Sequence, residues 1–356
     1  EYELYKNLKF KTSFGVDFNS YSRSYYRPST LPTSLDRLPP SVPEGSKRDK
    51  NMLNWVWENT LSYTTIIKDV HNLSAIAGWT AQKESVNTSL LAGNGYPNDL
   101  VHTMNAASAI TSWSATAYEW SLLSALARVQ YSYKGKYLLS AAARMDGSSR
   151  FGKNNRWGMF PSASAGWYIS EEDFMKDINW ISQLKLRLGF GVTGNAAIDP
   201  YSTKGAIQSL YYQWGSESPS IGYLPSDVSA KNPSKMANNE LTWEKTTQYN
   251  VGIDYGFLNN RISGSVDVYK TKTKDLLLDM TIPSLTGYVS TLANVGKTSG
   301  WGIDLQLNAI PVQTNDFTWN TTLTWSMDRS QIDALANGNT EDVNNRWFVG
   351  EEIGVY

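Results

Sequence analysis

Apolar and polar residues alternate one by one along much of this chain. In one clear example, Phe317, Trp319 and Leu323 share one side of the chain and polar residues fall between them. A repeat of two residues places successive side chains on opposite faces of an extended strand, so the pattern predicts β-strands. The clearest runs cover residues 8–19, 137–146, 184–193, 301–308 and 317–328.

Weaker runs bring the prediction to eleven strands. They cover about residues 52–66, 71–85, 119–133, 157–169, 242–255 and 260–272, and a candidate twelfth strand starts near Trp347. Several runs alternate for ten residues or more, whereas a globular strand usually has ~5–6 residues and a tilted membrane strand needs ~9–11. The run lengths therefore favour strands that cross a lipid bilayer.

The connections between the strands alternate between short and long. Short links lie near residues 68–72, 133–136, 257–261 and 311–317, with a short helical turn around 170–183. Long polar segments cover about residues 19–51, 85–118, 147–157, 194–241 and 273–296. Turns at one end and loops at the other are typical of periplasmic turns and extracellular loops. We therefore predict an all-β, antiparallel transmembrane barrel, with residues 1–356 as part of it and the long segments as extracellular loops.

Charged side chains follow the same two-residue pattern. Within the strands the polar side carries Lys9, Lys11, Arg128, Arg144, Lys185, Arg187, Asp254 and Asp304. Lys83, Lys245 and Lys270 fall on the apolar side, and we expect all three near the long-loop ends of their strands. A lipid-facing charge costs ~0–1 kcal/mol near the interface, against ~2–4 kcal/mol at the midplane.

Aromatic residues make up 13% of the chain, with 14 Trp, 21 Tyr and 10 Phe. Many lie near the ends of predicted strands, where aromatic girdles of a membrane barrel would form. These are Trp55, Trp57, Trp120, Tyr131, Tyr133, Trp167, Tyr168, Trp243, Tyr255, Trp301 and Trp319. For any single ring, cross-strand packing within a sheet is the alternative explanation.

Composition excludes several classes of function. The chain has no cysteine and only His71 and His102, so thiolate chemistry is impossible and a His-rich metal centre or triad is not expected. The net charge of -1 gives no electrostatic reason to expect nucleic acid as a partner. No stretch approaches ~18 apolar residues, and Glu1 to Leu4 do not resemble a signal peptide, so we expect a mature chain or a fragment.

The motifs in this sequence that suggest an enzyme lack residues or local structure that the corresponding chemistry requires. The segment from Gly147 through Gly152 and Lys153 approaches a phosphate-binding loop, but Asn154 lacks the required hydroxyl and no helix is predicted to follow. The adjacent acidic pairs at 171–172 and 351–352 are interpreted as solvated surface charges. We therefore expect no catalytic residues, no cofactor site and no metal site.

A long string of residues points to a known family. It runs from Arg144 to Ser162 as RMDGSSRFGKNNRWGMFPS and continues in SAGWYISEEDFM at 164–175. The strings LKLRLGFGVTGN at 184–195, LTWEKT at 241–246 and KTKDLLL at 272–278 agree with it. Together they closely resemble the SusC/RagA family of TonB-linked outer-membrane transporters from Bacteroidetes, across essentially the whole chain.

The resemblance implies a fold, partners and an activity. The fold would be a 22-stranded antiparallel barrel around an N-terminal plug, in the outer membrane, beneath a SusD-like surface lipoprotein. The activity would be import of oligosaccharides, or in some members peptides, energised by TonB with ExbB and ExbD. The eleven or twelve strands predicted here correspond to about half of such a barrel, so the plug and the terminal strands are expected to be absent from this sequence.

The family string also has a physical interpretation. Arg144 and Asp146 would end a strand on the lumen face, and Gly147 would permit the chain to bend. Further members of the hairpin, which returns at Trp157, are Arg150, Gly152, Lys153 and Arg156. We interpret this segment as a structural loop whose charges pair in the lumen or with neighbouring loops; direct ligand binding is the alternative.

Aromatic residues of the longest loop are candidate ligand contacts. They are Tyr211, Tyr212, Trp214 and Tyr223. Their rings could stack on sugar faces or pack against the lipoprotein, and the sequence does not separate the two.

A second hypothesis is a soluble, aromatic-rich β-protein that binds or cleaves carbohydrate. It predicts that the face carrying Phe317, Trp319 and Leu323 packs against a second sheet instead of meeting lipid.

Overall fold

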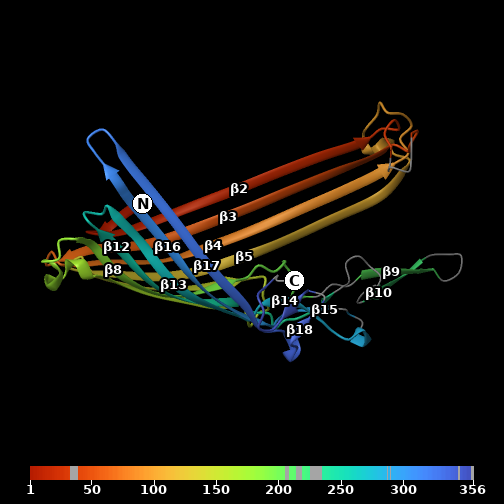
Figure 1. Ribbon diagram of the computed structural model, residues 1–356. Helices are drawn as coiled ribbons and strands as arrows, with labels where there is room; N and C mark the ends of the chain where they lie inside the picture. The colour runs from red at the N-terminus through yellow and green to blue at the C-terminus, as the bar shows by residue number, and fades with distance from the viewer. Residues whose placement is uncertain are drawn as a thin grey trace. The chain divides into compact units, whose positions relative to one another are not determined.

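The computed structural model describes residues 1–32, 39–204, 208–213, 219–224, 235–286, 288, 290–343 and 345–353 (Figure 1). It divides into two units. Unit 1 comprises Glu1–Thr12, Asn59–Trp79 and Leu123–Tyr356, and unit 2 comprises Ser13–Glu58 and Thr80–Leu122. The long strands β2 to β5 pass through both units.

Twelve strands form the main sheet, in the order β1-β2-β3-β4-β5-β6-β7-β8-β12-β13-β16-β17. Chain neighbours pair with each other, and every pair with a resolved register is antiparallel. The bounds are β1 Tyr2–Tyr5, β2 Leu8–Arg27, β3 Glu44–Ile67, β4 His71–Asn94, β5 Ala109–Tyr133, β6 Tyr137–Ser148, β7 Trp157–Tyr168, β8 Ile181–Asn195, β12 Glu244–Phe257, β13 Ile262–Lys274, β16 Lys297–Gln313 and β17 Thr318–Ala334.

All eleven strands expected from the alternation are present in this sheet, but the twelfth lies elsewhere. It is β1, at the beginning of the chain, and not the segment near Trp347. That segment forms β19 (Trp347–Phe348), which among the described residues pairs with β18 (Glu341–Asp342) in a separate two-stranded sheet. With two residues each, both are too short to show any alternation.

In unit 2 the strands continue through residues that we expected to be loops. The predicted loops 19–51 and 85–118 contract to the connections 28–43 and 95–108. Polar residues are common on both faces there, and apolar residues such as Leu90 and Leu91 also fall on both, which hides the two-residue repeat, while the ladder continues with side-chain hydrogen bonds. Ser20 Oγ donates to Asn51 Oδ1 at 2.8 Å, and Ser22 Oγ donates to Asp49 Oδ1 at 2.6 Å.

In unit 1 the two longest predicted loops contain short strands of their own. The segment 194–241 carries the hairpin of β9 (Gln208–Gln213) and β10 (Pro219–Leu224), and also β11 (Lys235–Met236). The segment 273–296 carries β14 (Leu277–Thr281) and β15 (Ser290–Asn294). β11 pairs with β15, so backbone hydrogen bonds join the two segments. The expected helical turn at 170–183 is present as two 3₁₀ turns, η2 (Ile169–Glu171) and η3 (Asp173–Met175).

Large apolar side chains stay exposed along the main sheet. Phe317, Trp319, Leu323 and Trp325 are 51–59% exposed, so in the described residues no second sheet covers this face. Only nine hydrophobic residues among those described are buried: Val86, Tyr96, Phe151, Phe160, Ile198, Leu241, Trp243, Ala293 and Ile332. This arrangement disagrees with the packed sandwich that the soluble hypothesis requires. No helix within the described ranges is long and apolar enough to cross a membrane.

Candidate functional site

Polar and small residues form continuous rows across one face of unit 1. One row runs from Ser140 on β6 through Ser164 on β7, Gly189 on β8 and Asn250 on β12 to Tyr269 on β13, each directly opposite the next. Directly opposite residues of antiparallel strands point to the same face. The face is therefore lined by groups that can hydrogen-bond to a solute or to water.

Arg187 of β8 binds two carboxylates on this polar face. Its Nε donates to Asp254 Oδ1 and Oδ2 at 2.9 and 3.0 Å. Its two terminal nitrogens donate to Asp267 Oδ1 and Oδ2 at 3.0 and 2.8 Å. The planar guanidinium suits such two-point contacts, which are stronger than neutral hydrogen bonds. The cluster links β8, β12 and β13 by side chains as well as by backbone.

Gly252 makes the contact between Arg187 and Asp267 possible. It lies on β12, directly opposite both residues, so the guanidinium must pass over it to reach β13. A Cβ atom at this position would lie 2.4 Å from Asp267 Oδ1 and 2.7 Å from an Arg187 terminal nitrogen. Real Cβ atoms do not approach other atoms so closely, so a Cβ atom here would force the guanidinium and the carboxylate out of this geometry.

The same geometry recurs further along the sheet. Tyr269 of β13 crosses Gly302 of β16 and donates from its hydroxyl to Asp328 Oδ1 of β17 at 3.2 Å. A Cβ atom on Gly302 would lie 2.4 Å from the tyrosine ring. Glycine on a middle strand thus allows polar side chains to join strands that are not neighbours.

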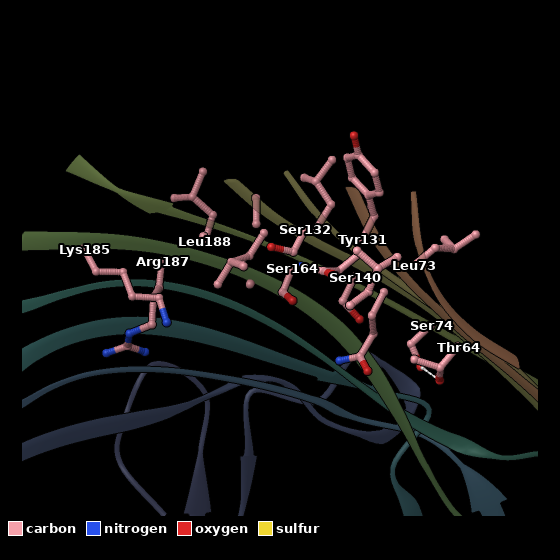
Figure 2. A pocket seen from close by; sticks show the side chains of 18 of the residues that line it. Thr64, Leu73, Ser74, Tyr131, Ser132, Ser140, Ser164, Lys185, Arg187 and Leu188 are labelled. Atoms are coloured by element: carbon pink, nitrogen blue, oxygen red, sulfur yellow. Dashed lines mark hydrogen bonds between the residues drawn. The ribbon is translucent and has the colours of Figure 1, made fainter. Parts of the chain in front are cut away.

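A hollow of about 750 Å³ lies along the polar rows (Figure 2). Its lining includes the polar residues Thr64, Ser74, Ser140, Ser164 and Arg187, and also apolar residues such as Leu73 and Leu138. Figure 2 shows Ser140, Ser164 and Arg187 on one side of the sheet and the side chains of Leu188 and Tyr131 pointing to the other. The lining offers hydroxyl, amide and guanidinium groups without a paired acid and base. It can bind a polar solute, and it contains no group arranged for bond chemistry.

The first two charged residues of the family string, Arg144 and Asp146, pair with each other. Arg144 Nε donates to Asp146 Oδ1 and Oδ2 at 2.7 and 2.9 Å, and an Arg144 terminal nitrogen donates to Ser124 Oγ at 2.9 Å. Asp146 and Ser124 are buried, with 8% and 1% exposure. These charges therefore contact protein groups at the loop end of β6.

Gly147 serves a different purpose from the one we expected. The strand does not bend there, since β6 continues to Ser148 and Gly147 lies directly opposite Trp157. A Cβ atom on Gly147 would lie 2.8 Å from the Trp157 ring. Because Gly147 has no side chain, the Trp157 indole has room to lie over it. This contact explains why a glycine stands opposite a tryptophan here.

The β6–β7 hairpin contacts both ends of the long segment 194–241. Arg150 donates to the carbonyl oxygens of Ala196 and Ile198 at 3.4 and 3.0 Å. At the other end, Asn155 Nδ2 donates to the carbonyl of Glu240 at 3.0 Å. Gly152 lies so close to the Asn239 carbonyl that a Cβ atom would be 2.2 Å from it. Lys153 lies in this hairpin between two strands, so no helix follows the near-match to a phosphate-binding loop.

Trp243 is a structural residue that the sequence led us to place in a membrane girdle. It is 4% exposed, and its indole nitrogen donates to the carbonyl of Arg156 at 2.8 Å. Its ring lies 5.3 Å from the ring of Phe151 and 5.2 Å from that of Phe160. These three rings form a small core at the base of the loops. The family string LTWEKT at 241–246 contains Trp243, and it was the sequence signal that could have marked this tryptophan as a structural residue.

Two of the predicted girdle residues, Tyr133 and Trp167, belong to an aromatic row at the short-turn end of β4 to β7, together with His71 and Tyr137, which we did not predict. His71, Tyr133, Tyr137 and Trp167 follow one another at centroid distances of 5.0, 6.2 and 6.5 Å. Glu172 ends the row by accepting hydrogen bonds from the Tyr137 hydroxyl and the Trp167 indole. Amphipathic rings of this kind are typical of a membrane interface.

Of the three charges that break the pattern, two lie where we expected them. Lys245 is the second residue of β12 and Lys270 is near the end of β13, both towards the long loops. The prediction that Lys83 lies near the long-loop end of its strand is wrong. Lys83 is the thirteenth of the 24 residues of β4, and its ammonium group pairs with the carboxylate of Glu119 on β5 at 2.8 Å. β4 is longer than the alternation indicated, so this position is far from its end.

A polar cluster joins two connections of unit 2. Asp99 accepts hydrogen bonds from the Ser29 backbone nitrogen at 3.0 Å, Ser29 Oγ at 2.6 Å and the Tyr26 hydroxyl at 2.9 Å. The bonds from Ser29 lower the pKa of Asp99 below its usual value. Partial burial and the bond to Asp99 raise the pKa of Tyr26 to about 12. His102 stacks on the Tyr26 ring at 3.9 Å.

The candidate loop aromatics are placed only in part. Tyr211 and Tyr212 belong to β9 and Tyr223 to β10, and Trp214 lies outside the described residues. Their contact with a sugar or a lipoprotein stays a prediction.

The pattern of an apolar outer face, a polar inner face and one-sided loops has a counterpart among known proteins. The family described as TonB dependent receptor-like, beta-barrel, matches residues 1–351. The chain belongs to this family. It is therefore part of an outer-membrane TonB-dependent receptor barrel, which confirms the predicted fold class and location, and this membership agrees with the expectation that the chain is not an enzyme.

Individual relatives refine the placement of this TonB-dependent receptor. TonB-dependent receptor P39 of Formosa agariphila is 32% identical over 337 residues, which are 94% of this chain and 31% of that protein. TonB-dependent receptor SusC of Bacteroides thetaiotaomicron is 41% identical over 233 residues, which are 64% of this chain and 22% of that protein. The structure of the RagAB peptide transporter aligns with a TM-score of 0.86 at 26% identity, covering 98% of this chain and 38% of that one. These likenesses confirm the SusC/RagA assignment, and the chain spans between 22% and 38% of the length of these relatives.

Proposed function

We propose that this chain forms part of the wall of an active outer-membrane importer that takes up oligosaccharides. The observation that carries the proposal is the two-faced sheet: an exposed apolar side suited to lipid and a continuous polar side suited to a hydrated lumen. Energy would come from TonB with ExbB and ExbD, acting on a plug. A SusD-like lipoprotein would cover the extracellular side.

The segment would contribute passage and recognition, and no bond chemistry. Hydroxyl and amide groups along the polar rows can replace the hydration of a sugar that passes them, as pore linings generally do. Fixed ionic clusters such as Arg187 with Asp254 and Asp267 would hold the wall in shape while the plug moves. The loops would provide surface for ligand or lipoprotein.

The substrate class is the finer part of the proposal. The higher identity is to SusC, at 41%, whereas the RagAB structure, at 26%, is described as that of a peptide transporter. Oligosaccharide import, which the resemblance to the SusC/RagA family implies, is our proposal, and peptide import is the alternative outcome of its test.

Uptake by whole cells tests the proposal. A strain that lacks the full-length receptor should lose uptake of a fluorescent oligosaccharide from its growth glycan, and the intact gene should restore it. Labelled peptides of similar mass serve as the second arm. Unchanged uptake of every labelled glycan in the deletion strain would contradict oligosaccharide import, and selective loss of peptide uptake would favour the RagAB-like alternative.

The long loop can be tested separately from the barrel. Deleting residues 208–224 removes the β9–β10 hairpin and leaves the loop base, with buried Ile198 and Leu241, in place. We expect a folded receptor with reduced import or with a lipoprotein that no longer co-purifies. Normal import together with normal co-purification would show that this hairpin contacts neither ligand nor lipoprotein.

A further inference from the structure

Six basic side chains gather at the long-loop ends of β12, β13, β16 and β17. We call this group the basic rim; its members are Lys245, Lys270, Lys272, Lys274, Lys297 and Arg329. They share the face that carries Val251 and Val268, and not the polar face with Arg187. The rim therefore belongs to the membrane-facing side of the receptor, at its extracellular margin.

Three lysines of the rim stand directly opposite one another. Lys274 on β13 is the register partner of Lys245 on β12 and of Lys297 on β16. Lys270 and Lys272 continue the row of charges along β13 towards the bilayer, and all three β13 lysines are exposed. Like charges directly opposite on neighbouring strands are destabilising. A row of this kind indicates that anions from outside the sheet balance it.

Acidic groups of the described residues are concentrated at one margin of the rim. Arg329 pairs with Glu352 at 3.1 Å, and Asp333 accepts a hydrogen bond from Ser299 at 2.8 Å. Within the described part of the chain, none of the five lysines takes part in an ion pair. The lysine row is thus available to an external anion.

An aromatic residue and a small hollow complete the surface. Trp301 lies directly between Lys270 and Arg329 and is 43% exposed. A hollow of about 280 Å³ beside it is lined in part by Ser299 and Gln331, and also by Glu351 and Glu352. Cations around a tryptophan, with hydroxyl and amide groups nearby, suit a ligand that carries both phosphate and sugar.

We propose that the basic rim binds the phosphorylated headgroup of a glycolipid in the outer leaflet of the outer membrane. The phosphate lies against the lysine row and the sugar ring against Trp301. The acyl chains continue along the apolar residues of the same face, including Val251 and Val268. Because these residues face the bilayer, a membrane lipid fits this surface better than a soluble anion or an acidic protein does.

Binding of purified glycolipid to the full-length receptor tests the proposal. Native mass spectrometry would titrate the detergent-purified receptor with lipopolysaccharide, with its enzymatically dephosphorylated form and with phosphatidylglycerol. Since each basic residue adds about fivefold to the affinity for an anionic lipid, the triple variant K245Q/K274Q/K297Q should bind lipopolysaccharide roughly 100-fold more weakly. The dephosphorylated lipopolysaccharide should bind the wild-type receptor as weakly as intact lipopolysaccharide binds the triple variant.

A matched control separates the rim from overall charge. The variant K6Q/K68Q/K134Q removes three lysines at the short-turn ends of the strands and should bind as the wild type does. The variant K245R/K274R/K297R keeps the charge and should retain binding, and heat-modifiability on gels verifies that each variant is folded. Equal binding by wild type and K245Q/K274Q/K297Q would overturn the proposal. So would equal binding of phosphatidylglycerol, or cross-linking of the lysines to an acidic protein instead of a lipid.

Discussion

Arg187 reaches Asp267 because the residue between them, Gly252, has no side chain. The sequence placed Arg187 and Asp254 on the polar side of their strands, which the structure bears out, but it did not pair them. Pairing depends on register, and one residue of slip would move every side chain to the other face. Alternation therefore indicates which face a charge takes, whereas the partner follows only from the aligned strands.

Substitution of Gly252 tests how much the ionic cluster stabilises the barrel. We expect Gly252→Val to displace the guanidinium from Asp267 and lower the free energy of unfolding by roughly 1–3 kcal/mol, since hydrogen bonds to charged groups are lost. Urea unfolding in detergent, followed by heat-modifiability, measures the change. Gly189→Ala is the matched control, because its Cβ would meet Asn250 Cβ at an ordinary 3.6 Å. Equal effects of the two substitutions would contradict the explanation.

The Asp99 cluster should depend on pH at both ends of the scale. The lowered pKa of Asp99 means that its contribution is present above its ordinary value of 3.8 and is lost as the pH falls through the lower folded value. The raised pKa of Tyr26 means that its contribution is present below 10.0 and is lost as the pH rises through about 12. The segments around Ser29 and Asp99 should therefore be protected from proteolysis between these limits.

Two substitutions separate the limbs of that profile. Tyr26→Phe should remove the alkaline loss, and Asp99→Asn should remove the acidic loss and weaken the cluster at neutral pH. Limited proteolysis with an enzyme active over the range, read by mass spectrometry, measures both. A profile of Asp99→Asn identical to that of the wild type would show that this carboxylate does not hold the connections together.

Whole strands show why alternation located eleven elements and misjudged their ends. β1 was missed because Tyr2–Tyr5 is too short to display a repeat. β2 to β5 run for 20 to 25 residues, and their outer parts carry polar residues on both faces with apolar ones such as Leu90, Leu91 and Trp113 on either, so the repeat fades while the ladder continues. The two-residue repeat appears where the two faces of a strand contact different surroundings. It disappears where both faces contact water.

Opposed lysines should make the β12–β13–β16 ladder less stable than it could be. In detergent free of glycolipid, Lys274→Gln should raise the free energy of unfolding by roughly 0.2–1 kcal/mol, because it relieves repulsion from Lys245 and Lys297. Lys272→Gln is the control in the same strand and on the same face, since its register partners Thr247 and Ser299 are neutral. Urea unfolding measures both variants. If Lys272→Gln stabilises the protein as much as Lys274→Gln does, repulsion between directly opposite lysines is not the cause of the effect.

At the scale of the whole molecule, the sequence indicated an order of strands that the structure confirms. Short turns predict that chain neighbours pair, and the sheet follows that order throughout. The loop base could not be predicted in the same way. Trp243 and Arg156 are 87 positions apart, and their contact depends on how a loop folds back over a hairpin. No local pattern encodes such a distance.

The assignment of the two faces has a direct test in the barrel. Leu323 and Thr324 are neighbours on β17, with Leu323 on the apolar face and 54% exposed. Leu323→Lys places a charge in lipid near the middle of the strand and should cost ~2–4 kcal/mol, whereas Thr324→Lys faces the lumen and should change stability little. Folding into lipid bilayers at several urea concentrations measures both. The opposite order of effects would reverse the faces.

The passage of the Arg187 side chain over Gly252 to Asp267 also couples the amino acids that evolution can accept at these three positions. A side chain at position 252 would displace the bridge between Arg187 and Asp267 from its present geometry, and a bridge of this geometry needs a residue without a Cβ atom on the middle strand. Among sequences of this family, these three positions should therefore change together, although they lie on three different strands. The same coupling should connect Tyr269, Gly302 and Asp328, independently of the first set.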